Sequence, residues 1–245
     1  MECLSRNERD SIVGQIDDIK TRFKRAQSRR QNWEAMWEDC ISYTMPGRQS
    51  FYTDSPGSER TELVFDETPI VALGEFVSRM QSAIVPPGRK WFRIEASSKI
   101  PEGSRKQVQA ALDEAGEFIY RKLLSSNMDV EVPEVLMDLA IGTGAMSVDV
   151  NEIGTPVFRA AALPNVWVEE GIDGKIGGLF RRRRMRAEQI NAEYRLDKKL
   201  DPKQNEEKVV IEATCRDYAN TGTETGVSVR FPEDENIEPS RHEYS

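Results

Sequence analysis

The stretch from Phe65 to Ile94 constrains the fold more than any other, because it contains a helix start, an apolar seam, a tight turn and a strand. Thr68 can cap a helix with its hydroxyl, and Pro69 suits the first helical position, where its missing N–H costs nothing. Apolar residues then follow at spacings of three and four, which predicts a buried helix face formed by Ile70, Leu73, Val77, Met80 and Ile84.

The end of this stretch predicts a turn and then a strand. The helix cannot continue through Pro86, Pro87 and Gly88, because proline lacks the N–H and fixes the backbone. The apolar residues that follow, from Trp91 and Phe92 to Ile94, are typical of a strand. From the pattern alone we interpret the stretch as a core helix that leads into a sheet, since seams at this spacing usually pack rather than bind ligands.

Length, cysteine usage and hydropathy indicate a soluble protein with a sizeable core. The 245 residues can form one large domain or two small ones. Cys3, Cys40 and Cys215 lie far apart without a CxxC pair, and His242 is the single histidine, so few ligands exist for a zinc site. No apolar run approaches the roughly 18 residues of a membrane-spanning helix. We therefore expect free thiols and a cytoplasmic protein without a signal peptide or membrane anchor.

The chain is acidic overall but contains two basic clusters. Lys and Arg number 34 against 42 Asp and Glu, a formal net charge of −8, which argues against a protein that coats DNA. The first cluster has six basic and no acidic residues from Lys20 to Arg30, and helical spacing favours a solvated face over a contact with phosphate or an acidic partner. The second could hold phosphate or cross-subunit carboxylates, of which we favour carboxylates. It comprises Arg181, Arg182, Arg183, Arg184 and Arg186.

Three further helices are predicted beside the central one. Residues 7–43 are typical of one long helix, or two in line, ended by Pro46-Gly47, and residues 49–61 of an exposed loop. Ser104 and Gln107 form a capping-box pattern for a second helix, which ends near residues 125–127, and Pro133 opens a third. The residues expected to be buried include Ile19, Phe23, Trp33, Trp37, Ile41, Val108, Leu112, Phe118, Ile119, Leu123, Leu136 and Leu139.

The third of these helices ends at Gly142-Thr143-Gly144, after which apolar residues recur with a period of two. Glycines can let a backbone approach phosphates. A dinucleotide fingerprint, however, needs a strand before the glycines and a helix after them, and its third glycine is missing here. We therefore expect Gly142 to end the helix in a left-handed conformation and Gly144 to let helix and strand approach closely.

A run of short antiparallel strands follows this junction, which predicts one α+β domain with a helical part to about residue 145 and a strand-rich part at 146–231. Turns are expected at 151–154, 172–174 and 220–222, and a helix at 187–199. A hydrophilic linker at 201–207 and a polar tail at 232–245 complete the chain. The expected strands are Met146–Val150, Pro156–Ala160, Val166–Glu170, Ile176–Arg182, Val209–Thr214 and Val227–Phe231.

No pattern of residues predicts an enzyme, a cofactor site or a metal site. The sequence has no GxSxG, Walker A or HExxH motif, and His242 lies in the polar tail. Adjacent carboxylates such as Asp17-Asp18 and Glu169-Glu170 point apart in a helix or strand, so general acid–base chemistry has no support. We therefore expect a protein that is not an enzyme.

Three stretches together resemble the head-to-tail connector, or portal, proteins of short-tailed bacteriophages. Residues 30–46 are similar to the family's long first helix, which ends in a Tyr-x-x-Pro pattern. Residues 65–92 are similar to its "D-S/T-T…L-x-P-P…W-F" stretch, and residues 139–148 to its helix-GTGAL-strand junction. The residues that carry the resemblance are Trp33, Tyr43, Pro46, Asp66, Thr68, Pro86, Pro87, Gly88, Trp91, Phe92, Gly142, Thr143 and Gly144.

The resemblance implies a portal wing region within a ring of usually about twelve subunits at one capsid vertex, through which DNA is packaged and ejected. The implied partners are further copies of the chain, a capsid or scaffold protein, the terminase, a tail adaptor and double-stranded DNA. It also implies a phage or prophage virion protein that is present in the host cytoplasm during assembly. No catalytic residue or cofactor is implied.

The resemblance covers only the first half of a portal. The stem, clip and pore segments of the family have no counterpart in this sequence, which implies a truncated or partial portal. We therefore expect that the chain alone does not conduct DNA and forms a ring weakly, unless wing contacts suffice. The alternative hypothesis is a nucleic-acid-binding module that uses the two basic clusters, whose affinity for duplex DNA would fall steeply with salt.

Overall fold

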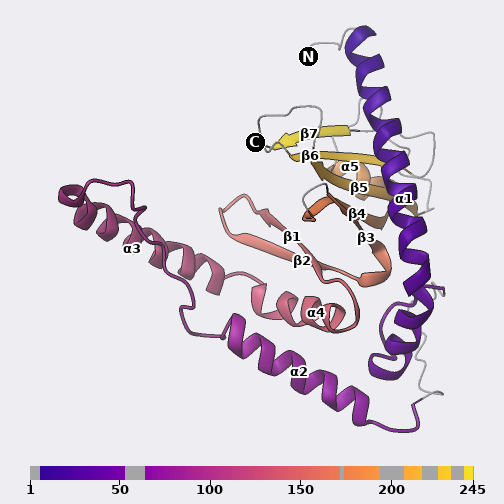
Figure 1. Cartoon of the computed structure of the whole chain (residues 1–245), viewed down its shortest axis with the longest axis horizontal. Helices are drawn as coiled ribbons and strands as arrows, with labels where there is room; N and C mark the ends of the chain where they lie inside the picture. The colour runs from indigo at the N-terminus through magenta and orange to yellow at the C-terminus, as the bar shows by residue number, and fades with distance from the viewer. Residues whose placement is uncertain are drawn as a thin grey trace. The chain divides into compact units, whose positions relative to one another are not determined.

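The computed structural model describes residues 6–52, 64–171, 174–193, 207–216, 226–232 and 240–244, with the side chains of 17–52, 64–171, 174–193 and 207–216. Helices and two small antiparallel sheets confirm the predicted α+β class (Figure 1). The helices are α1 (Arg6–Thr44), α2 (Thr68–Ile84), α3 (Glu102–Leu124), α4 (Met128–Ile141) and α5 (Ala187–Glu193). The strands are β1 (Ala145–Val150), β2 (Pro156–Ala161), β3 (Val166–Glu170), β4 (Ile176–Met185), β5 (Lys208–Arg216), β6 (Gly226–Pro232) and β7 (Ser240–Tyr244).

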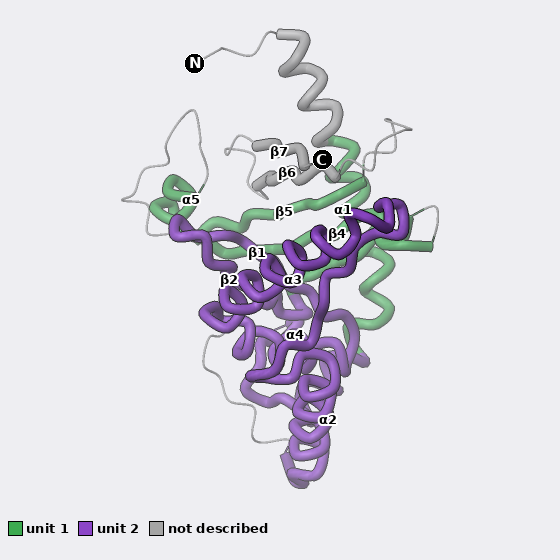
Figure 2. Tube along the Cα trace, turned by 90° about the vertical axis from the view of Figure 1, so that its left-hand side faces the viewer, with its two compact units in different colours: residues 1–35, 165–245 green, residues 36–164 purple. Residues whose placement is uncertain are grey.

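The chain divides into two compact units, which are described separately (Figure 2). Unit 1 comprises Met1–Ala35 and Asn165–Ser245, and unit 2 comprises Met36–Pro164. The chain therefore passes from one unit to the other inside α1 and again after β2. These boundaries differ from the expected division at residue 145. The assignment of all 245 residues to a single domain stays a prediction.

Unit 1 is built on a five-stranded sheet in the order β3-β4-β5-β6-β7. The first part of α1 packs on this sheet through apolar residues one turn apart, as the spacing predicts. The rings of Phe23 and Trp167 meet edge to face with centroids 5.2 Å apart, a favourable aromatic geometry. The buried cluster consists of Ile19, Phe23, Ala26, Trp167, Phe180, Ile211, Ala213 and Cys215.

The predicted strands and hairpin turns are confirmed where the structure describes them. β3 has the predicted bounds, whereas β4 runs on to Met185 because it pairs with β5 as far as Lys208. Gly154 and Gly174 adopt a φ of 72° in the turns after β1 and β3, a backbone conformation that favours glycine. α5 confirms the first part of the expected 187–199 helix. The predictions for residues 53–61, 172–173, 194–206, 217–225 and 233–239 lie outside the described residues.

The polar tail contains a strand that the sequence pattern did not predict. β7 pairs antiparallel with β6, from Gly226 opposite Tyr244 to Arg230 opposite Ser240. An edge strand is held by backbone hydrogen bonds to one neighbour and can form without alternating apolar residues. For this reason apolar periodicity does not reveal it.

Unit 2 combines the two-stranded ribbon β1-β2 with α2, α3, α4 and the last part of α1. α4 packs on β2 and α2 packs on α4. β2 therefore lies between β1 and α4, as Figure 1 shows. The first residues of the expected exposed loop are not exposed: Ser50 is buried and its Oγ donates to Glu38 Oε1, while the Phe51 N–H donates to Glu38 Oε2.

The helix starts of unit 2 differ from the predicted ones. Asp66, not Thr68, supplies the cap of α2: its Oδ1 accepts bonds from the N–H and the hydroxyl of Thr68. α3 begins at Glu102, so Ser104 lies inside its first turn and the capping box does not form. α4 begins at Met128, so Pro133 lies inside the helix and removes one backbone hydrogen bond. The residue pattern therefore predicts that these helices exist but not where α3 and α4 begin.

The predicted strand at Trp91, Phe92 and Ile94 is wrong, because no strand pairs with it among the described residues. The segment is nevertheless held like a strand by a glutamine of α3. Gln109 Nε2 donates to Ile94 O, and the Ala96 N–H donates to Gln109 Oε1. The Pro86–Gly88 turn before it is confirmed, with a Gly88 φ of 72° and a bond from Arg89 N–H to Pro86 O.

Several helix faces that the sequence predicts to be buried are exposed. On α2 only Val77 is buried, and Ile84 is 51% exposed. On α3 the expected core residues Phe118 and Ile119 are also exposed, as is Trp33 on α1. Among the expected core residues, Ile19, Phe23, Ile41 and Leu136 are buried. The helical spacing was identified correctly, but spacing does not say whether a face is covered within the same chain.

The glycine junction after α4 is explained by packing. The φ of Gly142 is −155°, so the predicted left-handed conformation is wrong. A Cβ at Gly142 would lie 2.9 Å from Cε2 of Trp37, and one at Gly144 would lie 2.7 Å from Val135 O. The predicted close approach at Gly144 is therefore confirmed. Gly142 is needed because the Trp37 indole packs against it.

Candidate functional site

The arginine cluster of β4 divides between the two faces of the sheet, as strand alternation requires. On one face Arg183 Nη1 lies 2.6 Å from Glu193 Oε1 and 3.1 Å from Glu212 Oε1. Arg181 lies 4.0 Å from the other oxygen of Glu212. Burial lowers the pKa of Arg183, but the carboxylates of Glu193 and Glu212 outweigh that effect and raise it. Carboxylates of the same chain thus already bind this part of the cluster.

The remaining arginines of the cluster have different surroundings. Arg182 Nε donates to Asn165 Oδ1, and its guanidinium lies 5.6 Å from the centroid of the Trp167 ring. The side chains of Arg184 and Arg186 are exposed. The expectation that this cluster meets carboxylates or phosphate of a partner stays a prediction.

The basic cluster of α1 also divides into two sets. Arg22 donates to Glu169 Oε2 at 2.7 Å and to the carbonyls of Gly177 and Arg216, and Arg30 donates to Glu34 and to Val166 O. These two arginines hold α1 on the sheet. The prediction that the basic residues of α1 form a solvated helix face is therefore wrong for them. It is right for the exposed side chains of Lys24, Arg25 and Arg29.

A buried ion-pair cluster in unit 2 was not predicted from the sequence. Asp138 is 1% exposed and accepts two bonds from Arg48, at 3.0 and 2.9 Å, and a third from the Leu163 N–H. Arg48 also bonds the Glu134 carboxylate. Burial raises the pKa of the Asp138 carboxyl, and the Arg48 guanidinium opposes that rise. The cluster joins the residues after α1 to α4 and to the end of β2, so its chemistry is structural.

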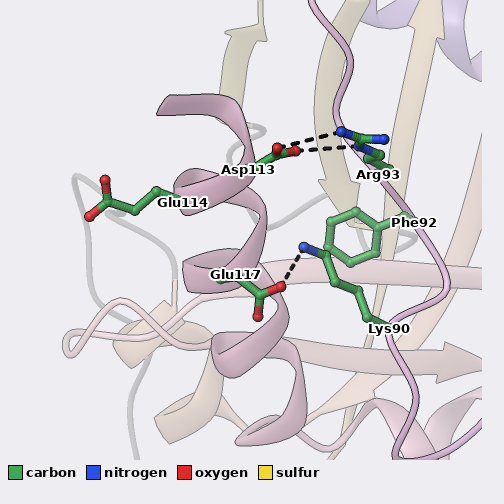
Figure 3. A pocket seen from close by; sticks show the side chains of 6 residues that line it. All are labelled: Lys90, Phe92, Arg93, Asp113, Glu114 and Glu117. Atoms are coloured by element: carbon green, nitrogen blue, oxygen red, sulfur yellow. Dashed lines mark hydrogen bonds and ion pairs between the residues drawn. The ribbon is translucent and has the colours of Figure 1, made fainter. Parts of the chain in front are cut away.

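An open groove of about 540 Å³ lies between α3 and the extended segment that follows the proline turn (Figure 3). Lys90 Nζ lies 2.8 Å from Glu117 Oε1, and Arg93 lies 3.4 Å from Asp113. The cations of one wall therefore neutralise carboxylates of the other, while Phe92 and Glu114 complete the lining. The groove holds no nucleophile paired with a base.

The ribbon β1-β2 has one edge closed by side chains of α4. The Asn127 side chain bonds both backbone groups of Phe158, with Nδ2 donating to the carbonyl and Oδ1 accepting from the N–H. Glu131 Oε2 accepts from the Ala160 N–H at 2.6 Å. Sequence reasoning missed both residues. An Asn just before an acidic helix start is the signal that could have indicated the first one.

The residues that carry the connector resemblance have structural positions in the described chain. Asp66 caps α2 through Thr68, and the Pro86–Gly88 turn ends it. The rings of Trp91 and Phe92 lie 5.1 Å apart in the extended segment, and Thr143 lies between the two packed glycines of the α4–β1 junction. On α1, Trp33 and Tyr43 are about half exposed and available to a partner.

The described residues offer no metal site and no membrane-spanning segment. No group of three or more His, Cys, Asp or Glu side chains is arranged to hold a metal ion in this part of the chain. Among the helices that the structure describes, none is long and apolar enough to span a membrane.

The comparisons with known proteins agree with the sequence motifs. No curated protein sequence matches the chain. A family model described as bacteriophage head to tail connecting protein matches residues 16–210, which contain α2, α3, α4 and the ribbon. The match also contains every residue that carries the resemblance. The chain therefore belongs to the family of bacteriophage head to tail connecting proteins.

Proposed function

We propose that this chain is a structural virion protein, a portal-like subunit that joins further copies of itself in a ring at the capsid vertex. It acts through assembly and not as an enzyme. In this role the ring is the passage for packaging and ejecting double-stranded DNA. Capsid or scaffold protein, terminase and tail adaptor are its other partners. Family membership supports the connector role.

The observation that carries the self-assembly is the apolar surface of unit 2. Its helices and ribbon have the apolar spacing of core elements, yet many large side chains on them remain exposed. Soluble monomers rarely expose extended apolar surface, and such surfaces mark interaction sites. The exposed residues are Val71, Phe76, Ile84, Trp91, Phe118, Ile119, Leu124, Val130, Leu139, Val148, Val150 and Ile153.

These side chains come from α2, α3, α4, β1 and two connecting segments, so the exposure is not confined to one helix. Burial of one such side chain in an interface contributes up to about 2 kcal/mol. A few of them are therefore enough to hold neighbouring copies together. In a ring, one surface of each subunit contacts a different surface of the next subunit. A chain that exposes apolar residues on several elements can supply both surfaces.

The proposal is tested by the protein composition of phage particles that encode this chain. Peptides of the chain are expected in purified particles, at a constant ratio to the capsid protein that survives washing with salt and detergent. A host protein that adheres to particles serves as the control, because washing should remove it. Absence of the chain from washed particles would contradict the proposed function.

A further inference from the structure

The two edges of the ribbon β1-β2 differ in how their backbone groups are satisfied. Because Asn127 bonds the N–H and the carbonyl of Phe158, these groups point away from β1. Phe158 lies opposite Val148, so the N–H and carbonyl of Val148 must point away from β2. The N–H and carbonyl groups of Met146 and Val150 point to the same side as those of Val148, because backbone groups alternate along a strand. α4 thus closes the edge of β2, while β1 has an open edge.

The open edge of β1 has no partner among the described residues. Val148 and Val150 are 55% and 69% exposed, and no hydrogen bond joins their outward backbone groups to this part of the chain. Natural proteins usually protect exposed strand edges with lysine, proline, a bulge or a covering element. β1, with the sequence AMSVDV, has no lysine, proline or bulge, and no described strand pairs with its outer edge, so that edge is suited to accept another strand.

The same unit contains a strand-like segment, residues 90–96, that pairs with no strand among the described residues. Its residues alternate between exposed and half-buried from Trp91 to Ser97. Gln109 bonds Ile94 O and the Ala96 N–H, which lie on one side of the backbone. The N–H and carbonyl groups of Trp91, Arg93 and Glu95 therefore point to the other side, where no described residue bonds them.

We propose that residues 90–96 of one copy add as a parallel strand to the open edge of β1 of the next copy. This inference rests on the proposed function and names the contact that joins its subunits. In this register Phe92 lies beside Val148 and Ile94 beside Val150. Val148 N–H donates to Trp91 O of the neighbour, and the neighbour's Arg93 N–H donates to Val148 O.

Side-chain complementarity selects this direction and register. Parallel pairing puts Phe92 and Ile94 on the same face as Val148 and Val150, and Arg93 beside Asp149 on the other face. The antiparallel register that pairs Arg93 with Val148 would put Phe92 beside Asp149, apolar against charged. The antiparallel register that pairs Trp91 with Val148 would put Arg89 beside Val150 and Arg93 beside Met146, again charged against apolar. Arg93 and Asp149 are both largely exposed, at 62% and 61%. Each also pairs within its own chain, Arg93 with Asp113 and Asp149 with Arg159, so the contact between copies would exchange these two exposed pairs for a new one.

The contact joins two different surfaces, so each copy can donate one segment and accept another. A heterologous contact of this kind generates rings or open chains of subunits and not closed two-fold dimers. Strand addition therefore fits a ring. A β1 strand paired with β1 of a second copy would instead produce dimers.

Disulfide trapping in the full chain tests the proposal. Neighbouring strands lie about 4.8 Å apart, within the Cα separations that a disulfide spans. A variant with Phe92→Cys and Val148→Cys is expected to give a ladder of linked chains on mild oxidation, with the 92–148 bond identified by peptide mass spectrometry. A mixture of the two single variants should give linked pairs only. Phe92→Cys with Ser147→Cys is the control, because residue 147 faces the other side.

Charge reversal supplies an independent measurement. Arg93→Glu is expected to abolish the ladder in the double-cysteine chain, and adding Asp149→Lys should restore it. Circular dichroism of each variant shows whether the fold is retained.

Each other outcome contradicts the proposal in a distinguishable way. Linkage of Val148→Cys to itself would show two-fold pairing of β1. A 92–148 bond within one chain would show that no second copy is needed. Self-association by light scattering without a 92–148 bond would overturn this contact but leave the proposed function intact. A single-chain mass in every variant and in the wild type would overturn both.

Discussion

At the scale of single residues, the ion pair between Arg22 and Glu169 anchors α1 on the sheet of unit 1. The side chains of the two residues are 12% and 10% exposed, and Arg22 Nη2 lies 2.7 Å from Glu169 Oε2. Carbonyls of Gly177 and Arg216 satisfy further donors of the guanidinium. Such a pair is expensive to break, because the remaining charge stays buried without a counter-ion.

Glu169→Gln is therefore expected to lower the free energy of unfolding by about 2–3 kcal/mol. Urea unfolding measures this loss. Glu75→Gln on α2 is the matched control, because Arg79 and Glu75 form a pair whose side chains are 82% and 60% exposed. Removal of an exposed pair should change stability by less than about 0.5 kcal/mol. Equal losses in the two variants would contradict the anchoring role.

Cys215 gives a pH-dependent prediction. Burial raises the pKa of its thiol from 9.0 to about 11, with Arg22 opposing the rise and Glu169 adding to it. The folded state therefore keeps the proton while the unfolded chain loses it, so the free energy of unfolding falls as pH rises from about 9 to about 11. The fall attributable to Cys215 is about 3 kcal/mol at most.

The measurement compares urea unfolding of the wild type and Cys215→Ala across this pH range. Above pH 9 the free energy of unfolding of the wild type should fall relative to that of Cys215→Ala. Alkylation provides a second readout: at pH 8 the folded protein should react at Cys40, which is partly exposed, before Cys215. A pH-independent difference would contradict the prediction.

At the scale of elements, the junction between α4 and β1 depends on the absence of two side chains. Gly144→Ala would place a Cβ 2.7 Å from Val135 O and 2.8 Å from Val135 Cγ1. The backbone atom cannot move aside without shifting α4. The variant is expected to lose about 1–3 kcal/mol of stability in urea unfolding.

Gly74→Ala inside α2 is the control for this glycine. A Cβ at Gly74 would have no described atom within 4 Å, and alanine favours a helix over glycine. Stability should therefore rise by about 0.5–1 kcal/mol. A similar loss in both variants would show that close packing is not the reason for Gly144.

Whether the sequence predicts a helix or strand correctly depends on which interactions define that element. β3 and the hairpin at 151–154 follow from local alternation and glycine positions, and the structure has them as predicted. The extended state of residues 91–97 and the closed edge of β2 depend on side chains distant in sequence, Gln109 for the first and Asn127 for the second. β7 depends on a neighbouring strand, so no local pattern reveals it.

The candidate site was only partly predictable for the same reason. The arginines of β4 stand out in the sequence, but their carboxylate partners Glu193 and Glu212 come from two other elements. Nothing in the spacing of Arg48 and Asp138, ninety positions apart, predicts that they meet. The glycine junction was recognised from its sequence, while the role of Trp37 beside Gly142 required the structure.

At the scale of the whole molecule, the two units differ in how completely they bury their apolar residues. The described side chains of unit 1 form a buried cluster between α1 and the sheet. Unit 2 leaves apolar residues of α2, α3, α4 and β1 exposed. In the proposed assembly, neighbouring copies would cover these exposed residues of unit 2.

The average molar mass in solution, measured by light scattering over increasing protein concentration, tests this account most directly. The mass is expected to rise above the 27.9 kDa of one chain as concentration increases, because copies associate weakly. A variant with Phe76→Ser, Phe118→Ser and Val150→Ser should stay at the mass of one chain. A wild-type chain that remains at 27.9 kDa at every concentration, or a variant that associates equally well, would contradict the account.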